Sequence, residues 1–386
     1  MSGFSGTMWR MRVLVAPDSF GGTLSAGEAA AAIAAGWARE APDDTVVTRP
    51  LSDGGPGLVE VIRATLGGTL VPVRARGPRM EELDASFLLL DDVAYLECAT
   101  VAGLQLVPAP ERDPKVTTTY GLGLLLAAAV EAGARTAVIG LGGSVTNDGG
   151  AGLLAALGAG PVGVSGTALP PGGAALRVCE GLAGVPALRG VQIVAATDVD
   201  NPLTGIHGAS AVYGPQKGAS DNDVQILDAA LAHWATVLER DLPGCPVDVG
   251  NLPGAGAAGG LGVALLALGG RREAGIGLVR RLIGFDAAVA EADLVITGEG
   301  SFDYQSLRGK VVAGVASAAA EHGAPCVVLA GRVAVGRQEA AAAHVDEARS
   351  LVEHAGLERA MGSAAEVLSD LAARTARDWS RPRSVR

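Results

Sequence analysis

The sequence predicts an α/β protein with two domains, and three observations lead to this expectation. Four segments have the pattern of a buried strand that runs into a polar loop, the alternation typical of α/β folds. Three short strands follow one another at 69–74, 85–90 and 93–97, which indicates an antiparallel or mixed sheet. The chain has 386 residues, too many for one ordinary core at roughly 100 to 200 residues per domain.

The first strand, loop and helix lie near the N-terminus. Residues 12–16 form a short apolar run that ends at Pro-Asp-Ser, which indicates a buried strand followed by a loop. Ser25 and Glu28 have the spacing of a capping box, so a helix is expected to begin near Ser25. The pattern of strand and polar loop recurs at 137–139, 191–196 and 293–297.

Two amphipathic helices are expected further along the chain, at 221–240 and 363–379, because apolar residues recur there at helical spacing. Residues 1–10 are expected to be a disordered extension and the final RPRSVR a frayed tail. Neither composition nor an internal repeat marks a domain boundary.

Composition excludes several classes of partner. The net charge of -11 and an aromatic content of 3% argue against binding a nucleic acid. The longest apolar stretches fall short of the roughly 20 residues that span a bilayer, and the first ten residues lack a secretory pattern, so a cytoplasmic protein is expected. The four cysteines have no C-x-x-C spacing, which predicts buried free thiols.

A glycine-rich loop, LGGSVTNDGGAG at 141–152, follows the second predicted strand. Glycine lets backbone amides approach an anion closely, and a helix N-terminus behind the loop favours negative charge, so the loop is a candidate phosphate site. A tight connection with capping side chains is the alternative. The candidate cofactor-binding residues are Gly142, Gly143, Ser144, Thr146, Asn147, Asp148 and Gly149.

Two acidic residues and a lysine follow the third strand. Asp198 and Asp200 lie in TDVDNPLTG, where carboxylates could hold Mg2+ or accept a proton from a hydroxyl group, unless they only form a local turn. Lys217 lies in GPQKG, where its ammonium group could neutralise phosphate oxygens, unless it is an ordinary surface lysine.

Three further loops carry polar residues beside glycine, in SDGGPG, PDSFGGT and GEGSFDYQSLRGK. Each alone is also ordinary turn chemistry, but together they suggest binding of a substrate. Serine-hydrolase and close histidine metal motifs are absent from the sequence. The candidate substrate-binding residues are Asp18, Ser19, Asp53, Glu299 and Asp303.

Six blocks in the same order resemble the bacterial glycerate kinase family, often called type I. They are VLVAPDSFGGTLSA, LSDGGPGLVEVI, GLGGSVTNDGGAGLLAALG, TDVDNPLTGIHGASAVYGPQKGAS, PGAGAAGGLGVALLA and DLVITGEGSFDYQSLRGKVVAGVA. The resemblance implies ATP-dependent phosphorylation of D-glycerate with Mg2+, commonly to 2-phosphoglycerate, with 3-phosphoglycerate left open. It also implies a Rossmann-like or flavodoxin-like domain from 11–60 plus 290–380, with a second α/β domain, 61–289, inserted into it.

The sequence departs from the family pattern at two positions. Gly21 stands where relatives usually have Lys, and Ser301 stands where they frequently have Arg. Both changes remove a cation that could pair with an acidic substrate. Lys217 or Lys310 could supply the positive charge instead.

The resulting hypothesis places the ATP phosphates on the backbone of 142–150. Asp198, with Asp53 as second choice, would accept the hydroxyl proton, and Lys217 would stabilise the transferring phosphoryl group. Asp198 and Asp200 would hold Mg2+. A kinase for another short hydroxy acid and a non-catalytic nucleotide or metabolite sensor are the alternatives, and a homodimer is left open.

Overall fold

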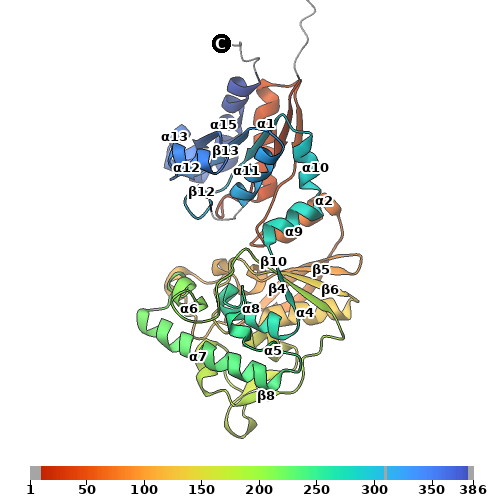
Figure 1. Ribbon diagram of the computed structural model, residues 1–386, viewed down its shortest axis with the longest axis vertical. Helices are drawn as coiled ribbons and strands as arrows, with labels where there is room; N and C mark the ends of the chain where they lie inside the picture. Colours follow the sequence, from red (N-terminus) through yellow and green to blue (C-terminus); the bar gives the residue numbers. More distant parts are fainter. Residues whose placement is uncertain (1–9, 308–310, 381–386) are drawn as a thin grey trace, which may run out of the picture. The chain divides into compact units, whose positions relative to one another are not determined.

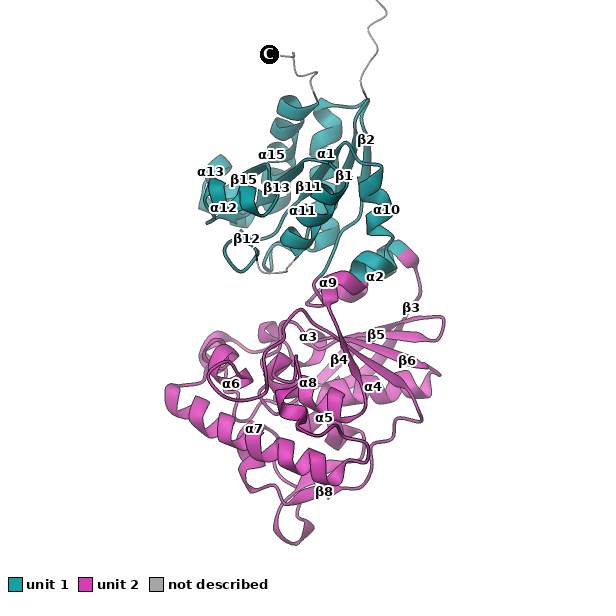
Figure 2. Ribbon diagram, viewed as in Figure 1, with its two compact units in different colours: residues 1–52, 60–65, 279–386 teal, residues 53–59, 66–278 magenta. Residues whose placement is uncertain are grey.

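The computed structural model describes residues 10–307 and 311–380, which form two compact units (Figures 1 and 2). Unit 1 contains the described residues of 1–52, 60–65 and 279–386, and unit 2 contains 53–59 and 66–278. Each unit combines helices with a sheet, so the predicted α/β class is confirmed. The domain boundaries expected near residues 60 and 290 stay a prediction. The extension expected at 1–10, apart from Arg10, and the RPRSVR tail lie outside the described residues.

Unit 1 is built on a parallel five-stranded sheet in the order β2-β1-β11-β13-β15. Numbered along unit 1 alone, this order is 2-1-3-4-5, that of flavodoxin-like folds, and it reverses direction between β1 and β11. The flavodoxin-like expectation is therefore confirmed. The strands are β1 (Arg12–Val15), β2 (Thr45–Thr48), β11 (Leu294–Thr297), β13 (Cys326–Ala330) and β15 (Glu347–Ser350).

Helices cover both faces of this sheet. Val13 and Val15 of β1 pack in one apolar cluster with α1 (Ala26–Glu40) and α15 (Ala364–Trp379). Helix α11 (Val311–Glu321) contacts β11 and β13, and its buried residues lie outside that cluster, so it covers the other face. The remaining helices of unit 1 are α10 (Phe285–Ala290), α12 (Arg337–Ala342), α13 (Leu351–Ala355) and α14 (Leu357–Gly362).

The first long helix, α1, begins where the capping box predicts. The Ser25 hydroxyl accepts a hydrogen bond from the Glu28 amide at 3.2 Å, and the Glu28 carboxylate accepts one from the Ser25 amide at 2.9 Å. Further along α1, Gly36 lies directly against the backbone of Ser369 in α15, with no room for a Cβ atom. Glycine at this position lets the two helices pack closely.

Unit 2 contains a six-stranded mixed sheet in the order β10-β9-β6-β5-β4-β3. The pairs from β10 to β5 are parallel, whereas β4 pairs antiparallel with both β5 and β3. The mixed sheet expected from three successive short strands is confirmed. The strands are β3 (Thr69–Arg76), β4 (Glu82–Leu90), β5 (Val93–Glu97), β6 (Thr136–Gly140), β9 (Gln192–Ala196) and β10 (Arg271–Glu273).

The core of unit 2 joins this sheet to its helices. Buried residues of α7 recur every three or four positions, from Leu227 to Leu238, and Trp234 among them is fully buried. The larger helices are α4 (Tyr120–Glu131), α5 (Ala151–Ala156), α7 (Asp221–Asp241) and α8 (Ala257–Ala267). Shorter elements are α3 (Ala99–Ala102), α6 (Ala209–Tyr213), β7 (Gly160–Val162) and β8 (Gly181–Ala183).

Two helices contain points at which the chain passes from one unit to the other, α2 (Leu58–Leu66) and α9 (Gly275–Leu282). A separate two-stranded pair, β12 (Ser301–Phe302) and β14 (Arg332–Val333), lies in unit 1. Within the described ranges, no helix is both long and apolar enough to cross a bilayer. All four cysteines are free thiols, as expected, although Cys245 is only half-buried.

The contact between α1 and α15 generates a stability prediction. Gly36→Ala should lower the free energy of unfolding by about 1 to 3 kcal/mol, because the new methyl group meets the Ser369 backbone. Helix propensity alone predicts the opposite sign, a gain of about 1 kcal/mol. Urea unfolding followed by circular dichroism decides between them. Gly362→Ala, at the end of α14 with open space around it, is the control and should be neutral or stabilising.

Candidate functional site

Three loops meet at the carboxyl ends of the central strands of unit 2. The Leu141 amide donates to the Ala196 carbonyl at 3.2 Å, and the Gly142 amide donates to the Gly54 carbonyl, also at 3.2 Å. A Cβ atom on Gly54 would lie only 2.7 Å from the same Ala196 oxygen. The segment that contains Asp53 therefore crosses the ends of β6 and β9 at close range, and it brings Asp53 to the loop of Asp198.

The carboxylates of Asp53 and Asp198 influence each other. Burial and, to a smaller extent, the negative charge of Asp53 raise the pKa of Asp198 to about 6, although hydrogen bonds from the Ile276 and Gly275 amides act in the opposite direction. The Ile276 amide donates to Asp198 Oδ2 at 3.3 Å, and Asp53 Oδ1 accepts from the Gly55 amide at 3.0 Å. A carboxylate with a pKa near neutrality is suited to accept a proton from a hydroxyl group.

Lys217 is buried, contrary to the alternative of an ordinary surface lysine, with only 2% of its surface exposed. Its Nζ donates to Ser144 Oγ at 3.0 Å and to the Thr146 carbonyl at 2.7 Å. Among the described residues, no carboxylate lies within ion-pair distance of this ammonium group. Burial lowers the pKa of Lys217 to about 8, although the charges of Cys98 and Asp148 act in the opposite direction. An ammonium group has three donors, so one of them can bind an anionic ligand.

A small pocket of about 110 Å³ lies beside this lysine. Its polar walls include Ser144, Lys217, Thr197 and Tyr213, and Thr197 is the residue before Asp198. The pocket is smaller than the roughly 300 to 1,000 Å³ of typical sites for drug-sized ligands. It has room for a small organic acid or a single phosphoryl group and not for a nucleoside. The full lining is Leu104, Leu141, Gly142, Gly143, Ser144, Thr197, Val199, Tyr213, Gln216, Lys217 and Ala258.

Asp148 of the glycine-rich loop is turned into the protein. Its fully buried carboxylate accepts hydrogen bonds from the amides of Thr119 at 2.8 Å and of Gly150 and Gly152 at 3.1 Å each. The hydroxyls of Thr118 and Thr119 also donate to it, at 3.2 and 3.0 Å. Burial raises the pKa of Asp148, and these hydrogen bonds oppose the shift. The carboxylate thus fixes the start of α5.

Thr146 and Asn147 are also fully buried. The Asn147 amide group donates to Ser210 Oγ at 2.9 Å, while Asn147 Oδ1 and Thr146 Oγ1 have no hydrogen-bond partner among the described residues. Gly149 accepts at its carbonyl from the Trp234 indole at 2.9 Å. Of the seven candidate cofactor-binding residues, only Gly142, Gly143 and Ser144 line the small pocket.

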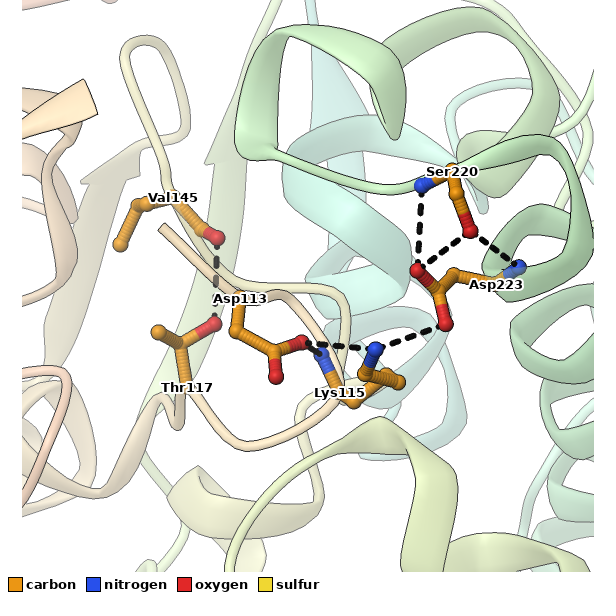
Figure 3. Close-up of polar contacts among 6 residues, drawn as sticks. All are labelled: Asp113, Lys115, Thr117, Val145, Ser220 and Asp223. Atoms are coloured by element: carbon orange, nitrogen blue, oxygen red, sulfur yellow. Dashed lines mark hydrogen bonds and ion pairs between the residues drawn. The ribbon is translucent and has the colours of Figure 1, made fainter. Parts of the chain in front are cut away.

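A polar network ties the glycine-rich loop to α7 (Figure 3). Thr117 Oγ1 donates to the Val145 carbonyl at 3.1 Å. Two residues earlier, Lys115 Nζ donates to Asp223 Oδ1 at 2.7 Å and lies 3.6 Å from Asp113 Oδ1. The hydrogen bond from Lys115 lowers the pKa of Asp223 to about 2. Sequence inspection does not single out this segment, because nothing local indicates that it contacts the glycine-rich loop.

The other predicted substrate-binding residues lie in unit 1. Ser19, Glu299 and Asp303 line a pocket of about 510 Å³ together with Gly21 and Ser301, the two departures from the family pattern. Asp18 precedes them, and its Oδ1 accepts from the Ser19 amide at 2.6 Å. Lys310 lies outside the described residues, and Asp200 is exposed on the surface of unit 2. The candidate residues therefore divide between the two units.

Comparison with known proteins identifies the same family throughout. Residues 13–380 match the model of the glycerate kinase family. The chain is 41% identical over 375 residues to a glycerate kinase of Bacillus subtilis strain 168, covering 95% of this chain and 96% of the relative. It is 43% identical over 327 residues to the glycerate 2-kinase of Escherichia coli strain K12, covering 83% and 85%.

A solved structure agrees with these relatives. The crystal structure of a proposed glycerate kinase 2 from Salmonella typhimurium LT2 superposes with a TM-score of 0.80 at 38% identity. The match covers 96% of this chain and 98% of that one. The resemblance inferred from the six sequence blocks is confirmed.

The Asp148 network generates a second stability prediction. Asp148→Ala should lower the free energy of unfolding by about 3 to 5 kcal/mol, because it leaves several buried donors without an acceptor. Asp84→Ala is the control: its side chain is 81% exposed and its ion pair with Arg74 is worth little. Chemical denaturation of both variants measures the difference, and equal stabilities would rule out a structural role for Asp148.

Proposed function

The chain belongs to the glycerate kinase family, a family of kinases, and we propose that it transfers a phosphoryl group from ATP to D-glycerate to form 2-phosphoglycerate. The observation that carries this proposal is the buried ammonium group of Lys217 in the wall of a small pocket, whose lining also includes Thr197 and Val199 on either side of Asp198. The name of the Escherichia coli relative, glycerate 2-kinase, supports the 2-hydroxyl as acceptor. Because ATP is the co-substrate, we also propose a cytoplasmic location.

In this proposal Asp198 accepts the proton of the glycerate hydroxyl as its oxygen attacks phosphorus. Its pKa of about 6 leaves the carboxylate mostly ionised at neutral pH and still basic enough to take a proton. Asp53 keeps that pKa raised through its own charge and is the second candidate for the base. The proton then stays on the carboxylate until the product leaves.

Lys217 stabilises the charge that spreads over the equatorial oxygens of the transferring phosphoryl group. The low polarity of its surroundings strengthens this interaction relative to water, and Ser144 and the Thr146 carbonyl hold Nζ in place. The Ser144 hydroxyl accepts from Lys217, so its own hydrogen can be donated to the same anion.

We assign the phosphate cradle to the backbone of Gly142, Gly143 and Ser144, which line the pocket. Thr146, Asn147 and Asp148 act behind it, since all three are buried and Asp148 holds the turn together. The proposed cofactor-binding set is therefore smaller than the one expected from the sequence and consists of Gly142, Gly143 and Ser144. Asp18, Ser19, Glu299 and Asp303 are proposed to bind a substrate group in unit 1.

The carboxylates of unit 2 fit a magnesium ion. Asp53 and Asp198 are close enough to raise the pKa of Asp198, and a cation would relieve this repulsion. Mg2+ is commonly held by one or two carboxylates together with the phosphates of a substrate. Asp53 would hold the ion, which would neutralise phosphate charge when bound, and Asp198 beside it would stay free to accept the hydroxyl proton; the expected role of Asp198 as a metal ligand stays a prediction. The expected role of Asp200 stays a prediction; burial and, to a smaller extent, the charge of Asp200 raise the pKa of Tyr213.

The first test of this proposal is turnover. Purified protein with Mg-ATP and D-glycerate should release ADP, and phosphorus NMR should identify 2-phosphoglycerate as the product. L-glycerate, glycolate, lactate and tartronate complete the panel. Stereospecific turnover of D-glycerate supports the proposal. Formation of 3-phosphoglycerate would change the acceptor hydroxyl, preference for another acid would change the substrate, and ATP binding without turnover would favour a sensor.

The two perturbed groups predict a bell-shaped pH profile of kcat/KM. Activity should fall below about pH 6 as Asp198 gains a proton, and above about pH 8 as Lys217 loses one. Asp198→Asn should lower kcat by about 10² to 10⁴ and remove the acidic limb. Lys217→Arg should remove the alkaline limb, because a guanidinium group stays protonated, even if kcat falls. If the acidic limb of the pH profile persists in Asp198→Asn, or the alkaline limb persists in Lys217→Arg, another group causes that limb.

A further inference from the structure

The larger pocket, in unit 1, lies where flavodoxin-like sheets bind ligands. Its walls come from the loops that follow β1, β11 and β13 and from α13 and α14. The strand order reverses between β1 and β11, and ligands of open α/β sheets bind beyond the carboxyl ends of the strands at such a point. The Asp18 amide donates to the Gly298 carbonyl at 2.8 Å, so these two loops run side by side there.

Part of the lining of this pocket is apolar. Leu351, Val352 and Ala360 line it together with Leu357 and Met361. Leu357 is 65% exposed and Met361 is 60% exposed, two large apolar side chains on the short helix α14. Such side chains gain from a flat apolar partner that removes them from water.

Another part of the lining is polar, with three hydroxyl groups, two carboxylates and one basic side chain. Ser19, Ser301, Glu299 and Asp303 line it, with Arg332 as its only basic side chain among the described residues. Carboxylates and hydroxyls accept hydrogen bonds from sugar hydroxyls, whereas two carboxylates disfavour a second anion. This composition suits an uncharged ligand with hydroxyl groups better than glycerate or a triphosphate.

The volumes of the two pockets also favour the unit 1 pocket as the site of a ligand larger than glycerate. The pocket of about 110 Å³ beside Lys217 is too small for a nucleoside, while the pocket of about 510 Å³ in unit 1 lies within the range of small-molecule sites. We propose that the unit 1 pocket binds adenosine and its nucleotides through the nucleoside, with the base against Leu357 and Met361 and the ribose hydroxyls on Glu299 and Asp303. The identity of the nucleotide rests on the proposed function.

Calorimetry with adenosine and with ADP tests this assignment on the full chain. Leu357→Asp and Met361→Asp place a charge on the apolar wall at exposed positions, where the fold should tolerate it. Each should weaken binding of both ligands by about tenfold or more. Val178→Asp is the matched control, since Val178 is 62% exposed in unit 2 and lines neither pocket, and it should bind both ligands as the parent chain does.

Kinetics separates this inference from the proposed function. The two unit 1 variants should raise KM for ATP and leave KM for D-glycerate within about twofold, and adenosine should compete with ATP and not with D-glycerate. Turnover with unchanged nucleotide affinity in both variants would overturn the adenosine site and leave the kinase assignment intact. Adenosine binding that the variants weaken, in a protein that phosphorylates no acid, would uphold the site and overturn the activity. A parent chain that binds neither adenosine nor ADP contradicts both.

Discussion

The buried ammonium group of Lys217 is the interaction on which the site in unit 2 depends. Removing this charge from water is unfavourable, and Ser144 Oγ and the Thr146 carbonyl replace only part of its hydration. Both acceptors belong to the glycine-rich loop, so the shape of that loop determines whether the lysine can be held at all. In the proposed function, an anionic group of the substrate in the adjacent pocket would supply a further partner, which would connect the stability of the loop to ligand binding.

The glycine-rich loop keeps its shape through side chains that face away from the pocket. The carboxylate of Asp148 accepts hydrogen bonds from the amides of Thr119, Gly150 and Gly152, and the Thr117 hydroxyl donates to the Val145 carbonyl. The polar residues of the glycine-rich loop therefore have two different roles. Asp148 fixes the backbone, and Gly142, Gly143 and Ser144 line the pocket.

Much of the fold could be predicted from the sequence, because it rests on local patterns. Apolar runs located β1, β6, β9 and β11, and the capping box at Ser25 located the start of α1. The candidate site was harder to predict from the sequence than the fold. The polarity of Asp148 does not reveal that its side chain turns inward, and a lysine in GPQKG is ordinarily exposed, whereas Lys217 is not. Tyr213 and Leu104 reach the pocket only through tertiary packing. The domain bounds implied by the family resemblance, 11–60 plus 290–380 and 61–289, already divided the candidate residues between two domains.

The order of the strands along the chain has a consequence for synthesis on the ribosome. Strand β1 pairs with β2 nearby, but its other neighbour, β11, begins at Leu294, and β13 and β15 come later still. The whole of unit 2 is translated in between. Unit 2 can therefore complete its core while the first strands of unit 1 still wait for partners. During that interval the apolar residues of β1 and α1 are exposed, and this is the period in which a nascent chain is most in need of a chaperone.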